Sequence, residues 1–228
     1  MAPLWVPVVA AMLRVILGYQ IDGRAALRHR YADLWRTRSG PLLICANHLT
    51  MIDSALIAWA LGSPWWYVRH FAAVPWNVPE RQHFAASVWA RVLVYVMKCL
   101  PLTRGGSRAT VAATLQRFTH VLAEGDAGLI FPEGGRGRSG RVDVDAAAYG
   151  VGRIVRSLPG CQVLCVYLRG ERQATYGDMP HRGDRFRVHL ELLHPTSSAT
   201  GVRGDRDVAL QIVRQLAAME QQHFDDRQ

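Results

Sequence analysis

Residues 41–61 read Pro-Leu-Leu-Ile-Cys-Ala-Asn-His-Leu-Thr-Met-Ile-Asp-Ser-Ala-Leu-Ile-Ala-Trp-Ala-Leu. The run from Pro41 to Ala46 is apolar at every position, which is typical of a strand buried on both faces. Polar Asn47 and His48 follow it, and an apolar helical pattern begins at Asp53. This stretch therefore predicts a strand, a polar turn and a helix, which together form the repeating unit of an α/β domain.

The same alternation continues along the chain. We predict further strands over residues 65–71, 99–102, 128–132, 161–168 and 185–193. We predict helices over residues 81–97, 108–123, 145–156 and 205–221. Strands that alternate with helices favour an α/β fold with a largely parallel central sheet flanked by helices. In such sheets ligands bind at the carboxyl ends of the strands, so the polar segments that follow the strands are the first candidates for a site.

The first 38 residues mix apolar side chains with arginines and predict one or two amphipathic helices, which end at Ser39-Gly40-Pro41. We therefore expect an N-terminal helical, membrane-associating segment over residues 1–39 and an α/β domain over 40–228. Residues 1–18 lack a basic leader and contain Arg14, unlike a targeting segment. No stretch reaches the ~20 apolar residues of a membrane-spanning helix. A cytoplasmic location is expected.

The chain is basic. Its 228 residues include 27 Lys+Arg and 18 Asp+Glu, a formal net charge of +9, and Lys98 is the sole lysine. Such a balance predicts attraction to an anionic partner: nucleic acid, an acidic carrier protein, a phosphorylated substrate or a lipid surface. Composition does not choose among them. The four cysteines never form Cys-x-x-Cys, which argues against a zinc site or a disulfide framework, and we expect no metal.

The most informative polar segment pairs His48 with Asp53. Nine His and twelve Asp give roughly 0.5 chance pairs at this spacing, so the spacing alone is weakly specific. In a continuous helix the two side chains would point to different faces, so they meet only if His48 precedes the helix and the chain turns between them. A carboxylate on one imidazole nitrogen leaves the other nitrogen free to take a proton. The alternative is a surface histidine beside a helix-capping aspartate.

Two more segments follow predicted strands. Residues 131–140 read Phe-Pro-Glu-Gly-Gly-Arg-Gly-Arg-Ser-Gly, in which glycines allow backbone N–H groups to approach an anion and arginines add charge. Residues 100–108 contain Arg104 just before a predicted helix, an arrangement typical of a phosphate site. The alternatives are an arginine-rich surface turn and a solvated connector.

In their order, these three segments resemble the motifs of the glycerolipid acyltransferases of the lysophosphatidate acyltransferase type. The resemblance spans roughly residues 40–170 and rests on Asn-His-x4-Asp, a strand that ends in an arginine, and Phe-Pro-Glu-Gly with an arginine two residues on. It implies an O-acyltransferase that moves a fatty acyl group from acyl-CoA or acyl carrier protein to a lysophospholipid-like hydroxyl, such as that of 1-acylglycerol-3-phosphate. It implies no cofactor.

The resemblance also implies residue roles. His48 matches the general base and Asp53 matches the residue that orients it. Positions matching the acceptor-binding residues are Asn47, Arg104, Glu133, Gly134 and Arg136. The family's motif usually reads Phe-Pro-Glu-Gly-Thr-Arg-Ser, whereas glycine stands here at positions 135 and 137. These departures leave the identity of the acceptor open, including a non-glycerolipid acceptor.

Two further hypotheses concern partners. The stretches 4–17 and 84–97 combine Val, Leu and Trp with arginine, which suits a peripheral or monotopic protein on the inner face of the cell membrane, in contact with anionic lipid. Alternatively, both stretches cover the core. The net charge also suits a basic nucleic-acid-binding protein, but the arginines are dispersed and no nucleic-acid-binding motif is present, so we expect no nucleic acid partner. A noncatalytic homologue is the remaining alternative.

Overall fold

The computed structural model describes residues 2–80, 94–103 and 105–227. Its strands are β1 (Gln20–Ile21), β2 (Leu42–Ala46), β3 (Trp76–Asn77), β4 (Gly128–Ile130), β5 (Gln162–Gly170) and β6 (Arg185–Leu193). Its α-helices are α1 (Ala2–Ala11), α2 (Arg24–Thr37), α3 (Asp53–Leu61), α4 (Pro64–Arg69), α6 (Arg108–Ala123), α7 (Tyr149–Ser157) and α8 (Gly201–Asp225). Short helical turns are η1 (Met12–Ile16), η2 (Phe71–Ala73) and η4 (Val144–Ala146).

The strands form one sheet in the order β1-β6-β5-β2-β4-β3. Strands β5, β2, β4 and β3 run parallel to one another, whereas β6 is antiparallel to β5 and β1 is parallel to β6. The prediction of an α/β fold with a largely parallel sheet is therefore confirmed. The antiparallel pair β5–β6 explains why residues 185–193 alternate in polarity, since such a strand has one face less buried than the other.

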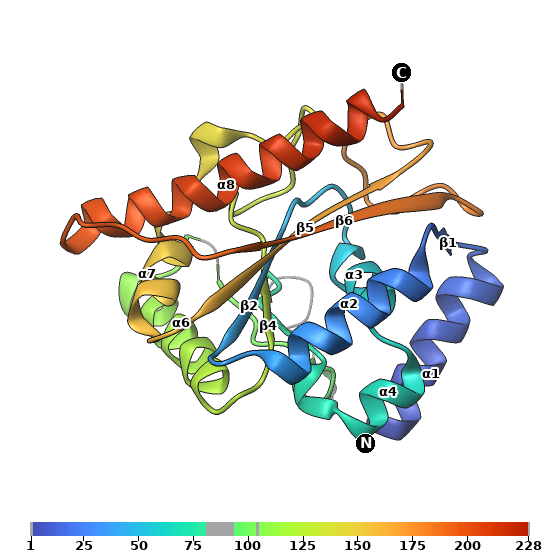
Figure 1. The fold of residues 1–228 in the computed structure, drawn as a ribbon, viewed down its shortest axis with the longest axis horizontal. Coiled ribbons are helices and arrows are strands. Elements are labelled where there is room, and N and C mark those ends of the chain that lie inside the picture. The colour runs from blue at the N-terminus through green and yellow to red at the C-terminus, as the bar shows by residue number, and fades with distance from the viewer. Residues whose placement is uncertain (1, 81–93, 104, 228) are drawn as a thin grey trace.

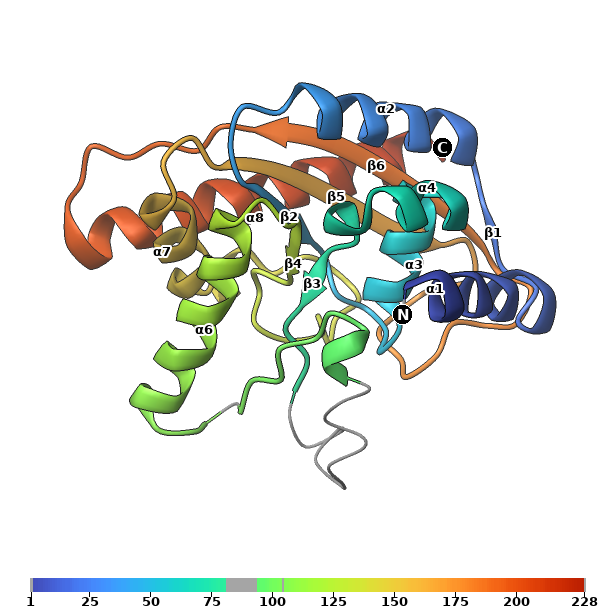
Figure 2. The same ribbon diagram turned by 90° about the horizontal axis from the view of Figure 1, so that it is seen from below.

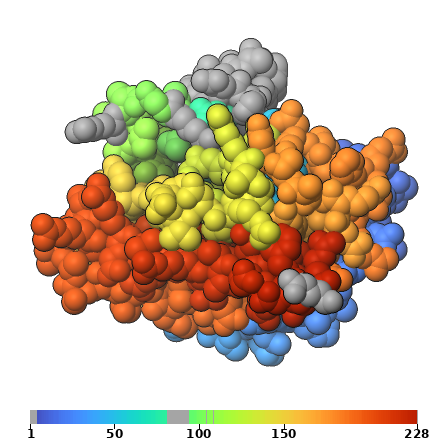
Figure 3. Space-filling view, turned by 90° about the horizontal axis from the view of Figure 1, so that it is seen from above, coloured from blue at the N-terminus to red at the C-terminus, as the bar shows by residue number. Residues whose placement is uncertain are grey.

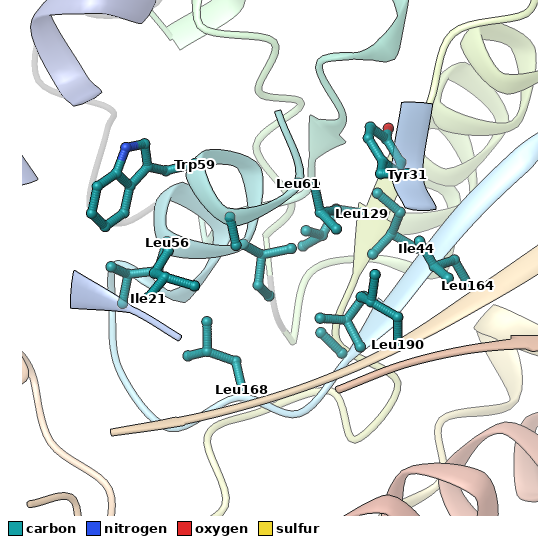
Figure 4. Close-up of a cluster of buried hydrophobic side chains, with 14 of the residues drawn as sticks. Ile21, Tyr31, Ile44, Leu56, Trp59, Leu61, Leu129, Leu164, Leu168 and Leu190 are labelled. Carbon is teal, nitrogen blue, oxygen red and sulfur yellow. The ribbon is translucent and has the colours of Figure 1, made fainter. Parts of the chain in front are cut away.

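Helices cover both faces of the sheet and create two cores. In Figure 1, α8 runs along one side of β5 and β6 while α1, α2 and α4 lie on the other, and Figure 2 shows α6 and α7 at one end of the sheet and α1, α3 and α4 at the other. Strand β2 alternates between the cores: Leu42 and Ile44 face α1–α4, and Leu43 and Cys45 face α6–α8. Figure 4 shows the first core, in which side chains of α2 and α3 pack on the strands. Burial on both sides explains why residues 41–46 are apolar without interruption.

Two of the predicted strands are wrong. Residues 65–71 form α4 and η2, because the Ser63 side chain accepts a hydrogen bond from the Trp66 backbone and Pro64 occupies the first turn, both of which favour a helix start. Residues 99–102 form only single bridges, between Asn77 and Cys99 and between Glu80 and Leu102. The aromatic side chains of residues 65–67 mimic a strand in composition, but the Ser-Pro start determines the structure.

The predicted helices agree with the structure more closely than the predicted strands do. Helix α6 has the predicted bounds, α7 begins a few residues later than predicted, and α8 extends beyond the predicted range at both ends. The predicted helix 81–97 lies mostly outside the described residues. Residues 1–39 contain β1 and α2 as well as α1, and the division of the chain at residue 39 stays a prediction. In the described part of the chain, no helix is both long and apolar enough to cross a membrane.

Candidate active site

The candidate site lies where β2 and β4 end. These strands are parallel neighbours, with Cys45 opposite Ile130, so the segments that follow them meet at one edge of the sheet. Asn47 and His48 come directly after β2, and Phe131 and Glu133 come directly after β4. Two of the three polar segments singled out in the sequence are thereby brought together.

His48 and Asp53 contact each other. Their Nδ1 and Oδ2 atoms are 3.0 Å apart, and α3 begins at Asp53, so His48 lies in the turn before the helix as the spacing requires. The same Oδ2 accepts hydrogen bonds from the backbone N–H groups of Leu49 (2.6 Å) and Thr50 (2.7 Å), and the Thr50 hydroxyl contacts Oδ1. A carboxylate held by this many donors is fixed in position.

The environment of the two side chains differs. Only 1% of the Asp53 side chain is exposed, against 13% of the His48 side chain. The His48 ring stacks on Phe131, with centroids 3.9 Å apart and planes 9° apart. Among the described residues, His48 Nε2 has no hydrogen-bond partner. The ring is thus held from two sides with one nitrogen available, which is the arrangement required of a general base.

The loop after β4 approaches His48 through its backbone. Gly137 N–H donates to the His48 carbonyl oxygen over 3.0 Å. A Cβ atom on Gly137 would lie 2.7 Å from the Arg141 carbonyl oxygen and 3.6 Å from Oε2 of Glu133. A side chain at this position would require the Arg141 backbone to shift, which accounts for glycine where the family's motif commonly has serine.

Glu133 lies half-buried in this loop. Its Oε2 accepts a hydrogen bond from the Asp143 backbone N–H over 3.0 Å. Burial raises the pKa of Glu133 to about 7; the hydrogen bond from Asp143 opposes this change, and the nearby Glu220 carboxylate adds to it. Glu133 is therefore partly protonated near neutral pH.

Arg136 connects the loop to a third segment. Its Nη1 donates to the Gly177 carbonyl oxygen (2.9 Å) and to Asp178 Oδ1 (2.7 Å). The same segment is hydrogen-bonded to the His48–Asp53 turn, because Gly177 N–H donates to the Leu49 carbonyl and Met51 N–H donates to the Asp178 carbonyl. Residues 173–178 thus form a third wall of the site that the sequence did not suggest.

The remaining predicted site residues are Asn47, Gly134 and Arg104, and they differ in their surroundings. Asn47 is buried, and its side-chain amide bonds both the backbone N–H and the carbonyl of Leu168, which ties the end of β2 to β5. Gly134 adopts a left-handed conformation with φ of 68° at the start of the loop. Arg104 lies outside the described residues. Within those residues, no group of three or more His, Cys, Asp or Glu side chains is placed to hold a metal ion.

Sequence reasoning missed two residues that shape the pair. Thr50 binds the Asp53 carboxylate, and a hydroxyl three residues before an acidic helix start is a local signal that was readable in the sequence. The stacking of Phe131 on His48 had no local signal, since it depends on β2 and β4 being neighbours.

The fold and the site together define an α/β protein with a histidine–carboxylate pair at the carboxyl edge of a largely parallel sheet. The chain belongs to the acyltransferase family, whose model matches residues 20–169. The fold is similar to that of the crystal structure of the 1-acyl-sn-glycerophosphate (LPA) acyltransferase PlsC from Thermotoga maritima, with a TM-score of 0.51 and 14% sequence identity over 94% of this chain and 79% of that chain. No curated protein matches the chain.

Proposed function

We propose that the protein transfers a fatty acyl group from acyl-CoA or acyl carrier protein to a hydroxyl of a lysophospholipid-like acceptor such as 1-acylglycerol-3-phosphate. The observation that carries this proposal is the His48–Asp53 pair at the edge of the sheet, in which Nε2 has no partner among the residues that the structure describes. Membership of the acyltransferase family supports the reaction class, and the similarity in fold to PlsC, a 1-acyl-sn-glycerophosphate acyltransferase, suggests the acceptor.

The geometry of the pair supports direct transfer with His48 as general base. His48 Nε2 takes the proton of the acceptor hydroxyl while the hydroxyl oxygen attacks the thioester carbonyl carbon. The buried Asp53 carboxylate stabilises the resulting imidazolium through Nδ1. The tetrahedral intermediate collapses, the carbon–sulfur bond breaks, and the imidazolium returns the proton to the leaving thiolate. The products are an ester and a free thiol, and no covalent enzyme intermediate or cofactor is needed.

We assign the acceptor to the loop after β4. Arg136 is part-exposed and pairs with the mostly exposed carboxylate of Asp178, so an acceptor phosphate can compete for its guanidinium. Glu133 and Gly134 lie in the same loop and would contact the polar part of the acceptor. Asn47 and Arg104 complete the predicted set of acceptor-binding residues.

The fatty acyl chain requires an apolar space near the reacting atoms. A pocket of about 120 Å³ lies between α1, α3, α4 and β3, and its lining includes Trp5, Val9, Ala58, Trp59, Tyr67 and Leu129. Ser54, which directly follows Asp53, also lines it. We assign the acyl chain to this pocket.

The membrane proposal rests on an apolar surface near the site. Val15 and Ile16 of η1 are 77% and 61% exposed, although Val6 of α1 and Leu13 of η1 are buried in the core. Residues 178–182 link this segment to the turn that carries His48, because the Arg182 side chain donates to the Ile16 carbonyl and the Met51 N–H donates to the Asp178 carbonyl. Peripheral contact with an anionic membrane on its cytoplasmic side would place a lysolipid beside His48.

The alternatives have less support. Many arginines bond to the protein itself, as Arg28 does to the Trp59 carbonyl and Arg38 to the Gly125 carbonyl, so the net charge need not serve a nucleic acid. A non-glycerolipid acceptor stays open, because the loop around Gly137 departs from the family's motif.

The acceptor is tested by product identification. The purified protein is incubated with an isotope-labelled acyl group attached either to CoA or to acyl carrier protein. The acceptors are a panel of lysophospholipids, glycerol phosphate and amines, and mass spectrometry identifies the product. We expect labelled diacylglycerol phosphate from 1-acylglycerol-3-phosphate. Labelled product from an amine or a non-glycerolipid acceptor alone would overturn the proposed acceptor, and no acyl transfer to any acceptor would overturn the function.

A further inference from the structure

The guanidinium of Arg169 joins the two loops that form the site. Arg169 is 3% exposed and lies near the end of β5. Its Nη1 donates to the Gly140 carbonyl oxygen over 2.6 Å, in the loop that carries Glu133 and Arg136. Its Nε and Nη2 donate to the carbonyl oxygens of Gln173 (3.1 Å) and Ala174 (2.9 Å), which begin the third wall of the site.

The counter-charge of Arg169 comes from the C-terminal helix. Glu220 of α8 is 8% exposed, and its Oε1 lies 3.7 Å from Arg169 Nη1 and accepts a hydrogen bond from the Tyr167 hydroxyl over 3.0 Å. Its Oε2 accepts from the Val142 backbone N–H over 3.2 Å. Figure 3 shows α8 lying along the yellow segment that follows β4. Helix α8 lies beyond residues 20–169, which the family model matches.

The connection reaches His48 through backbone hydrogen bonds. Gly137, three residues before Gly140, bonds the His48 carbonyl, and Gly177, three residues after Ala174, bonds the Leu49 carbonyl. A shift of either loop therefore changes the position of the acceptor relative to the imidazole.

We propose that Arg169 and Glu220 are positioning residues for acyl transfer, and that their buried ion pair holds the two loops in the arrangement that presents the acceptor to His48. The inference rests on the proposed function for its kinetic consequence. Neither side chain contacts His48 or Asp53 in the structure, so both act through the loops.

The contacts of Arg169 and Glu220 require an arginine and a glutamate at these positions. Arg169 donates from three nitrogens of a planar fork, and a lysine ammonium on a flexible stem cannot reach carbonyls on both loops at once. Glutamine in place of Glu220 keeps the shape but loses the charge and one acceptor oxygen, so it cannot accept from both Tyr167 and Val142. Leaving a buried guanidinium without its counter-charge is costly, and we expect the loops to loosen.

The test compares Arg169→Lys and Glu220→Gln with Arg156→Lys as a matched control. Arg156 also pairs with a carboxylate of α8, Asp205, and bonds the carbonyls of Ala199 and Gly201, but the Asp205 end of the helix lies 15 positions, about 22 Å, from Glu220. Readouts are the KM for acceptor, the KM for thioester, kcat, and hydrogen exchange of residues 137–143 and 173–178.

We expect Arg169→Lys and Glu220→Gln to lower kcat/KM for the acceptor about 10- to 100-fold, with the KM for thioester little changed, because the misplaced group is the acceptor. Exchange in both loops should rise, and Arg156→Lys should change neither readout. Unchanged exchange and unchanged acceptor KM in a folded variant would overturn the inference, and if Arg169→Lys fails to fold, Glu220→Gln decides. Should the wild-type protein transfer no acyl group, the proposed function fails, and the exchange data still decide whether the ion pair positions the loops.

Discussion

At the scale of single residues, helix geometry gave the condition under which His48 and Asp53 meet, while the sequence left open a surface histidine beside a helix-capping aspartate. A contact over five positions requires a turn before the helix, and α3 indeed begins at Asp53. The contacts that complete the site were not predictable in the same way. Phe131 and Gly137 reach His48 only because β4 pairs with β2, and pairing between strands so distant in the chain has no local sequence signal.

Glu133 gives a prediction about stability and pH. The carboxyl titrates at about 7 in the folded protein and at 4.5 in its unperturbed state, so between these values the unfolded chain is ionised while the folded chain is still protonated. The free energy of unfolding should therefore fall as the pH rises from 4.5 to 7 and stay lowered above it. The Glu133→Gln variant has no carboxyl to ionise at this position. Its free energy of unfolding at pH 8 should therefore exceed that of the wild-type protein by about 1–2 kcal/mol, after allowance for solvent screening.

Urea unfolding of the wild-type protein and of Glu133→Gln at pH 4.5 and pH 8 measures the effect. The gain should be present at pH 8 and nearly absent at pH 4.5. An equal difference at both pH values would show that the carboxyl does not titrate in this window.

At the scale of elements, patterns in the sequence predicted most strands and helices but failed at residues 65–71. Trp, Tyr, Val and Phe favour a strand, and the helix forms because Ser63 and Pro64 start it and because Tyr67 packs in the core. The residues that start the helix therefore determine the structure of this segment, although its composition favours a strand. Strand β1 has two residues, too few for any periodic pattern to predict it.

The crossing of α7 and α8 gives a prediction about packing. A Cβ atom on Gly152 would lie 1.8 Å from the Asp205 carbonyl oxygen, so the two helices approach each other backbone to backbone. Gly152→Ala should cost at least about 2 kcal/mol of stability, since an overpacked contact must separate the helices.

Gly150→Ala on the same helix is the matched control. A Cβ atom there meets only Leu115 Cδ1 at 3.6 Å, an ordinary contact, and should stabilise the protein by about 0.5–1 kcal/mol through helix propensity. Thermal unfolding of both variants compares them. A Gly152→Ala protein as stable as Gly150→Ala would contradict the close crossing.

At the scale of the whole molecule, the excess of positive charge now has a partial explanation. Arg136, Arg156 and Arg169 bond to carboxylates and to backbone carbonyls within the fold. Arg14 of η1 and Arg24 of α2 line one surface hollow with residues 18–21 and have no carboxylate partner in the described part of the chain. Composition predicted an anionic partner without locating it, because the location depends on which arginines the fold pairs internally.

Vesicle binding tests the exposed apolar surface. The full-length protein should sediment with vesicles of phosphatidylglycerol and phosphatidylcholine at low salt, and Val15→Asp should weaken binding about tenfold, since burial of a valine side chain contributes about 1.5 kcal/mol. Val202→Asp is the control, because Val202 is 54% exposed on α8, across the sheet from α1. A protein that stays in the supernatant, or equal binding by both variants, would contradict membrane contact through η1.

The central claim is that His48, oriented by Asp53, takes the proton in acyl transfer. The most direct measurement is the rate of labelled acyl transfer from acyl-CoA or acyl carrier protein to 1-acylglycerol-3-phosphate by His48→Ala. His120→Ala serves as control, because the His120 side chain is 72% exposed on α6. We predict a loss of at least about 100-fold for His48→Ala, in the range of general-base contributions, and none for His120→Ala. A folded His48→Ala protein that keeps more than about a tenth of the wild-type rate would contradict the claim.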